Sequence, residues 1–157
     1  MKKYFTILVV LFLTSCASYH QLMVGPDGSI TDCWATGQGL IGMSVAQTHT
    51  DNCADNLRKA GYLPIEEAGV IGIMLSSDDS LYVIKVHENS PASKAGMKVG
   101  NKLIKIDSQP VHNTKDAKLL LMGKKDTPVN IAVLADGAKV EYNLIRASYV
   151  ETFGTPK

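Results

Sequence analysis

The stretch from residue 90 to 111, SPASKAGMKVGNKLIKIDSQPV, constrains the fold most, because helix, turn and strand signals follow one another closely in it. Ser90 predicts a helix N-cap, since its hydroxyl can accept a hydrogen bond from a free amide of the first turn, and a proline follows at the first helical position. Gly96 is expected to end this short helix, because glycine adopts the left-handed conformation easily. The apolar run 103–106 then predicts a short buried strand, and residues 107–108 a tight turn.

The same stretch resembles the core of a PDZ domain, a family that commonly carries Ser-Pro-Ala, Ala-Gly, Gly-Asp, an apolar strand, Asn-Gly and a final Val. The matching segments here are Ser90-Pro91-Ala92, Ala95-Gly96, Gly100-Asn101, Leu103 to Ile106, Asp107-Ser108 and Val111. Asn101 and Asp107-Ser108 depart from the pattern but keep turn chemistry. The resemblance covers roughly residues 67–147. It implies an α+β fold, a small capped antiparallel β-barrel or sandwich with two helices.

Upstream of this stretch, Val70, Ile71, Gly72 and Ile73 resemble the loop that precedes the peptide-pairing strand of PDZ domains. In that family the backbone amides of the loop hold the terminal carboxylate of a peptide. The resemblance therefore implies a peptide-binding site here. The residues alone also fit an ordinary core strand with a bulge at its glycine.

Asn113 predicts the N-cap of a helix over residues 114–122. Thr114, Lys118 and Leu121 share one face at helical spacing. In a PDZ domain this face walls the peptide groove, so we expect it, Leu121 included, to lie outside the core. Class I domains carry His where Thr114 stands, so that specificity does not transfer. Lys118 is either a site for an acidic ligand side chain or a solvated lysine.

The N-terminus has the composition of an export signal. Two lysines precede an apolar run over residues 4–13, which is too short to span a bilayer. Leu13-Thr14-Ser15-Cys16 resembles the lipobox of bacterial lipoproteins, which implies acylation of Cys16 and membrane anchoring by its acyl chains. A plain signal peptide or an N-terminal helix are the alternatives. Ala17 after the cysteine resembles the pattern sent to the outer membrane, facing the periplasm.

These observations divide the chain into four parts: a lipoprotein signal peptide over 1–15, a tether and disulfide-linked helical segment over 16–66, a PDZ-like domain over 67–148 and a tail over 149–157. We expect the tail to fray. Within the tether, Gly25 to Gly28 predicts a turn, which a short strand pair could flank.

Cys33 and Cys53 are the two remaining cysteines, and in an exported chain such a pair predicts a disulfide. His49 and Asp51 lie near Cys53, but neither a CxxC nor a HExxH spacing is present, so we expect no metal site and no cofactor. Residues 35–46 between the cysteines are rich in glycine and small residues. They fit a loop leading into a helix, or a helix that packs closely on another chain or the membrane. Asp51 is expected to cap a helix over residues 52–60, ended by a glycine.

The net charge is +1, and −1 without the two N-terminal lysines, so no nucleic-acid partner is expected. No Gly-x-Ser-x-Gly motif occurs, and the residues outside the PDZ-like region are too few for a protease domain, so we expect no enzyme. The sequence predicts a membrane-anchored envelope lipoprotein whose non-catalytic PDZ-like domain binds protein C-termini or exposed strands. The alternative is a docking or regulatory subunit of an envelope protease or secretion complex acting in trans.

Overall fold

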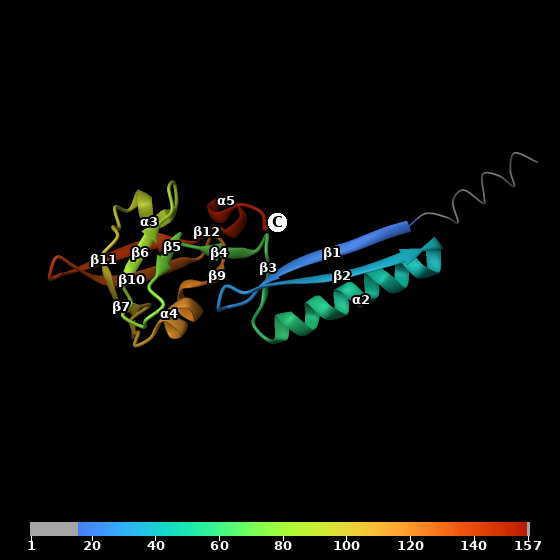
Figure 1. Ribbon diagram of the computed structural model, residues 1–157, viewed down its shortest axis with the longest axis horizontal. Helices are drawn as coiled ribbons and strands as arrows, with labels where there is room; N and C mark the ends of the chain where they lie inside the picture. The colour runs from blue at the N-terminus through green and yellow to red at the C-terminus, as the bar shows by residue number, and fades with distance from the viewer. Residues whose placement is uncertain (1–15, 157) are drawn as a thin grey trace, which may run out of the picture. The chain divides into compact units, whose positions relative to one another are not determined.

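The computed structural model describes residues 16–156, so the predicted signal peptide over 1–15 lies outside it. The described residues form an α+β structure, as predicted, and contain four helices and several antiparallel sheets (Figure 1). The strands are β1 Cys16–Val24, β2 Ile30–Gln38, β3 Leu63–Pro64, β4 Ala68–Val70, β5 Ile73–Leu75, β6 Val83–Val86, β7 Lys102–Ile106, β8 Gln109–Pro110, β9 Gly123–Lys124, β10 Pro128–Ala135, β11 Ala138–Ile145 and β12 Ala147–Ser148. The helices are α2 Gly39–Lys59, α3 Pro91–Lys94, α4 Thr114–Leu121 and α5 Tyr149–Phe153. None of these helices has both the length and the apolar composition that crossing a bilayer requires.

The chain divides into two compact units. Among the described residues, one contains 16–23 together with 30–64, and the other contains 24–29 together with 65–156. The turn between β1 and β2 therefore clusters with the C-terminal unit.

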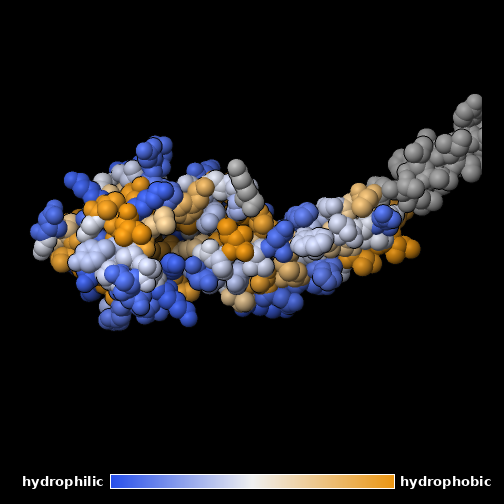
Figure 2. Space-filling model, viewed as in Figure 1, coloured by the Kyte–Doolittle hydropathy of each residue, from blue (hydrophilic) through white to orange (hydrophobic). Residues whose placement is uncertain are grey.

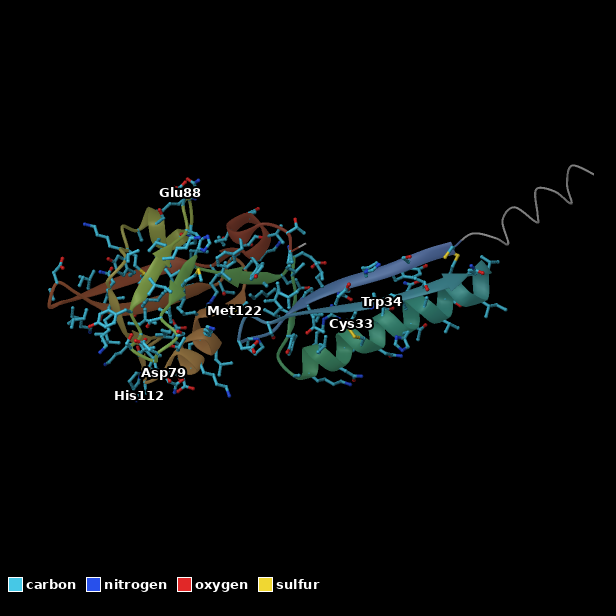
Figure 3. The ribbon with its side chains drawn as sticks, in the orientation of Figure 1. Cys33, Trp34, Asp79, Glu88, His112 and Met122 are labelled. Atoms are coloured by element: carbon cyan, nitrogen blue, oxygen red, sulfur yellow. A yellow bond between two sulfur atoms is a disulfide. The ribbon has the colours of Figure 1, made fainter. Side chains whose placement is uncertain are left out.

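In the N-terminal unit, strands β2, β1 and β3 form a sheet, and helix α2 packs on β2. The structure pairs Cys33 of β2 with Cys53 of α2, with their Cα atoms 5.8 Å apart, which confirms the predicted disulfide (Figure 3). Met23, Cys33 and Ala54 are buried together between sheet and helix. The disulfide thus lies inside the small core that joins the helix to the sheet.

The helix of this unit is longer than predicted. It begins at Gly39 rather than after Asp51, which lies within it, and strands β1 and β2 replace most of the expected tether. A Cβ on Gly37 would lie 2.0 Å from the carbonyl oxygen of Gly42, so the glycines allow the strand end to lie directly on the helix. The glycine-rich segment is therefore a close strand–helix contact within one chain rather than a loop.

The C-terminal unit has a four-stranded sheet in the order β11-β10-β7-β8, a three-stranded sheet β12-β4-β9 and the pair β5-β6. These antiparallel sheets remain separate within the described residues and do not close into a barrel. A hairpin at Asp136-Gly137, a dipeptide typical of tight hairpin turns, joins β10 to β11 with both turn residues at positive φ. Ser90 accepts from the Ser93 amide at 3.2 Å and Asn113 from the Asp116 amide at 2.8 Å, so both predicted helix caps are confirmed.

The expected frayed tail is wrong, because residues 149–153 form helix α5. Strand β12 pairs with β4 immediately before it, which fixes the start of the helix. Within α5 the rings of Tyr149 and Phe153 meet edge to face with centroids 5.0 Å apart. This contact orders the segment, since aromatic side chains four residues apart share one helix face.

Candidate functional site

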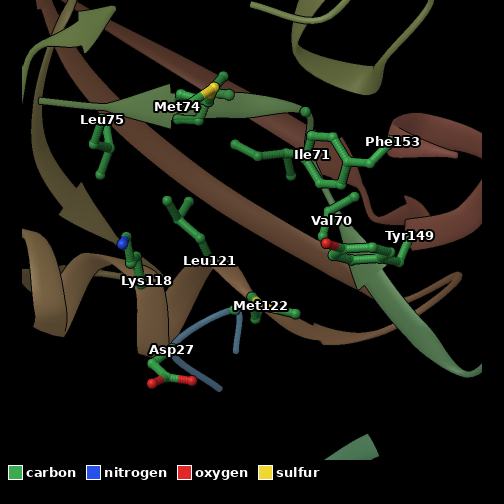
Figure 4. A pocket seen from close by; sticks show the side chains of 13 residues that line it. Asp27, Val70, Ile71, Met74, Leu75, Lys118, Leu121, Met122, Tyr149 and Phe153 are labelled. Atoms are coloured by element: carbon green, nitrogen blue, oxygen red, sulfur yellow. The ribbon is translucent and has the colours of Figure 1, made fainter. Parts of the chain in front are cut away.

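The C-terminal unit contains a cavity of about 330 Å³ between strand β5 and helix α4, which we call the groove (Figure 4). Its volume lies within the range of ligand sites in proteins. The residues that line it are Asp27, Gly28, Val70, Ile71, Gly72, Ile73, Met74, Leu75, Lys118, Leu121, Met122, Tyr149 and Phe153. The structure thus brings together six of the seven predicted peptide-binding residues, all except Thr114.

The loop at residues 71–72 separates β4 from β5 and has an unusual backbone. Gly72 has a φ of +79°, and a Cβ there would lie 2.2 Å from Cβ of Ser90, so only glycine fits. The carbonyl oxygens of Ile71 and Gly72 accept from the amides of Ala92 at 3.0 Å and His87 at 2.8 Å. Among the described residues, no group accepts a hydrogen bond from the backbone amide of Ile71 or Gly72. The loop therefore has its carbonyls fixed and its amides available for an anion.

Strand β5 has one free edge. It pairs with β6 through Ile73↔Val86 and Met74↔Lys85, and no other described strand lies beside it. An edge of this kind presents unpaired N–H and C=O groups to an extended chain. In Figure 4 the side chain of Leu75 points from β5 toward α4, across the groove.

Helix α4 forms the opposite wall with Lys118 and Leu121. Leu121 is only 7% exposed and packs in the main core, so the expectation that this groove face lies outside the core is wrong. The reason is that Leu121 lies at the last turn of the helix, where it covers the core and the groove at once. Lys118 is exposed and is the basic side chain among those lining the cavity.

Thr114 lies outside the cavity. Its hydroxyl donates to the carbonyl oxygen of Ser76 at 2.9 Å, and its amide donates to Oδ1 of Asp79 at 2.8 Å. With its side chain buried and its hydroxyl in use, Thr114 joins the start of α4 to the segment after β5. Thr114, which was predicted to bind peptide, therefore has a structural role at one end of the groove and does not line it.

The sequence interpretation missed the residues that α5 and the β1–β2 turn contribute. Tyr149 and Phe153 lie beside Val70 and Ile71 at the loop end of the groove (Figure 4). Their spacing of four residues was a usable signal for one aromatic helix face. Asp27 and Gly28, by contrast, carry no local signal that they would lie at this cavity.

The charges around the groove are few. Asp27 accepts from the hydroxyl of Ser29 at 2.6 Å and from its amide at 2.9 Å, and these bonds lower the pKa of Asp27. Lys118 lowers that pKa further by a smaller Coulombic effect. His87 contacts the ring of Phe153 edge to face at 4.6 Å, and partial burial, with a further effect of Lys85, lowers its pKa. His87 thus supports α5 from outside the groove.

Residues 69–145 match the family model of the PDZ domain. This region is a PDZ domain. The match starts in β4 and ends in β11, so α5 and the β1–β2 turn, which line the groove of this PDZ domain, fall outside the matched residues.

Two curated relatives are described as probable periplasmic serine endoproteases, DegP-like. The one from Rickettsia conorii (strain ATCC VR-613 / Malish 7) is 26% identical over 132 residues, covering 77% of this chain and 26% of the relative. The one from Rickettsia prowazekii (strain Madrid E) is 28% identical over 135 residues, with the same two coverages. The chain thus spans about a quarter of the length of these relatives. Among solved structures, the photosystem II D1 C-terminal processing protease superposes with a TM-score of 0.49 at 23% identity, covering 52% of this chain and 24% of that one.

Proposed function

We propose that this protein is a bacterial envelope lipoprotein, attached through Cys16, whose PDZ domain binds the C-termini or exposed strands of other proteins without a catalytic centre of its own. The observation that carries the binding proposal is the groove. It combines free amides at Ile71 and Gly72, a free edge of β5 and an apolar wall from α4. These are the three parts that binding of a terminal strand by β-addition requires.

The lining of the groove indicates the ligand chemistry. Tyr149, Phe153 and Leu121 surround the end nearest the amides, where the last side chain of a bound peptide would lie. A large apolar last residue would bury the most surface there, and burial of apolar surface is favourable. Lys118, further along the wall, favours an acidic side chain in the ligand.

The decisive experiment compares peptides with free and amidated C-termini. The chain from Cys16 onward is screened with a peptide library, and the best ligand is titrated in both forms. Hydrogen bonds to a charged group contribute roughly 1.5–3 kcal/mol each, so amidation should weaken binding at least about tenfold. Equal affinities for both forms would rule out recognition of the carboxylate.

The wall of the groove needs a substitution that leaves the core intact. Because Leu121 is buried, Leu121→Lys would destabilise the domain as well as block the groove, so it does not isolate binding. Lys118→Glu changes an exposed side chain and should weaken an acidic peptide several-fold. Lys115→Glu on the same helix, outside the lining, is the matched control and should have no such effect. If the two variants bind alike, the ligand does not contact Lys118.

Anchoring is tested separately. Cys16 is exposed and unpaired at the start of β1, so its thiol is accessible for modification. Cys16→Ser should abolish incorporation of a fatty-acid analogue and release the protein from membranes. Membrane association that persists in Cys16→Ser without label would contradict acylation as the anchor.

A second function fits the relatives. They are named periplasmic serine endoproteases, which supports an envelope location and a protease-associated role for this chain. As a docking or regulatory subunit, the PDZ domain would bring a partner to a protease in trans. A crosslinking pull-down from envelope fractions distinguishes the two functions when wild type is compared with Lys118→Glu. The docking or regulatory role requires that a protease be among the partners lost in Lys118→Glu.

A further inference from the structure

Helix α2 is unusual because its buried residues are small, whereas the large apolar residues of its first half are exposed. The buried positions are Ala46, Thr50 and Ala54, whereas Leu40, Ile41 and Val45 are 78%, 81% and 62% exposed. A helix that packs on a sheet normally buries its large apolar side chains. Here the close contact of Gly37 with Gly42 fills the inner side, so the large side chains are left facing outward. We call Leu40, Ile41 and Val45 the apolar patch.

The apolar patch lies at the end of the N-terminal unit where the chain enters it. Strand β1 begins at Cys16 and its hairpin partner β2 ends at Gln38, so the two residues lie at the open end of the hairpin. Helix α2 starts one residue later (Figure 1). In Figure 2 hydrophobic residues gather over this part of the unit. The patch and Cys16 therefore share one end.

The same end carries no formal charge. No Asp, Glu, Lys or Arg occurs from Cys33 to Thr50, while the second half of α2 carries Asp51, Asp55, Arg58 and Lys59. The unit is thus polarised along its length, with an uncharged apolar end and a charged opposite end. Exposed apolar groups without charge are suited to the boundary between lipid headgroups and acyl chains.

We propose that the apolar patch inserts into the surface of the lipid bilayer beside the anchor at Cys16. This inference rests on the proposed attachment through Cys16. The anchor holds the patch at the membrane, and insertion of three apolar side chains orients the unit with its charged end in water. Because the patch is uncharged, the contact does not require anionic lipid and is insensitive to salt.

The test uses vesicles of phosphatidylcholine with brominated acyl chains, which quench tryptophan fluorescence only within the bilayer. Trp34 is the single tryptophan of the sequence, so Trp34→Phe provides a silent background for Ile41→Trp, Val45→Trp or Asn52→Trp. Asn52 is exposed on the same helix and is the matched control. The chain from Cys16 onward is attached to the vesicles by a maleimide phospholipid at Cys16, so the measurement does not depend on acylation in the cell.

We expect the tryptophans introduced at positions 41 and 45 to be quenched several-fold more by brominated lipid than the one at position 52, and protected from aqueous acrylamide. Equal quenching at all three positions, or none, overturns the proposal. Absence of lipid quenching together with concentration-dependent dimerisation that Ile41→Gln abolishes assigns the patch to a second copy of the chain instead. If Cys16 is not labelled by the fatty-acid analogue in cells, native acylation is refuted. The vesicle measurement still tests insertion of the apolar patch, because the maleimide attachment does not depend on acylation.

Discussion

The guanidinium of Arg146 donates to the carbonyl oxygen of Leu121 at 2.9 Å and so fixes the end of the helix that walls the groove. It also donates to the carbonyl oxygens of Leu120 at 2.8 Å and Pro128 at 2.9 Å. Arg146 is 7% exposed, and this burial lowers its pKa, an effect that Asp107 opposes. One buried cation thus satisfies carbonyls at the end of α4, which otherwise lack donors.

Arg146→Met should lower the free energy of unfolding by roughly 3 kcal/mol, because several carbonyls would lose their donors in a buried place. Arg58→Met is the control, because Arg58 forms an exposed pair with Asp55 and its loss should change stability by about 0.5 kcal/mol or less. Urea unfolding of the two variants measures the difference. Similar losses in both would mean that the Arg146 hydrogen bonds contribute little.

Gly72→Ala and Gly96→Ala form a second matched pair. Both glycines have nearly the same φ, +79° and +80°, but a Cβ on Gly72 meets Ser90 whereas one on Gly96 meets nothing within 4 Å. Gly96→Ala should cost about 1–2 kcal/mol from the backbone alone. Gly72→Ala should cost roughly 3 kcal/mol, since overpacking adds to the same strain, and should also weaken peptide binding. Equal losses in thermal unfolding would show that the loop relaxes around the added methyl group.

Removal of the disulfide by Cys33→Ala with Cys53→Ala should destabilise the N-terminal unit by roughly 3 kcal/mol in the chain-entropy account. Trp34 follows Cys33 in the sequence, so its fluorescence reports the unfolding of this unit in denaturant. Cys16→Ala, which leaves the bridge intact, is the control. An unchanged midpoint in the double variant would mean that packing of α2 on β2 holds the unit without the bridge.

His87 should make stability depend on pH. Its pKa is lowered in the folded chain, so below the ordinary value of 6.5 the unfolded chain binds the proton first. Stability should therefore fall as the pH drops from 6.5 through the lowered pKa of the folded state. Phe153→Ala removes a ring that covers His87 and should raise its pKa toward 6.5, as an NMR titration of the imidazole would measure. A pKa that Phe153→Ala leaves unchanged would assign the burial to other neighbours.

Local chemistry made much of the fold predictable. The caps at Ser90 and Asn113 were predicted correctly, because each depends on the conformation and hydrogen bonds of a few adjacent residues. The loop at Gly72 was recognised through its resemblance to the carboxylate loop of PDZ domains, since the residues alone also fit a core strand with a bulge. The pairing of Cys33 with Cys53 followed from their number and the predicted export.

Features set by distant packing were not predictable in this way. The start of α2 was missed because its inner face is made of small residues, which do not give the usual apolar period. The double role of Leu121 depends on where the last turn of α4 meets the core. The contribution of Phe153 to the groove depends on how β12 directs the chain after the last long strand.

The division of the chain into units has a consequence for how this PDZ domain can be transferred between proteins. The chain passes from one unit to the other after residues 23, 29 and 64. A gene fusion that takes only residues 65–157 would leave behind Asp27 and Gly28, which belong to the lining of the groove. Transfer of the groove with its complete lining would therefore require the β1–β2 hairpin and α2 in addition to the PDZ domain itself.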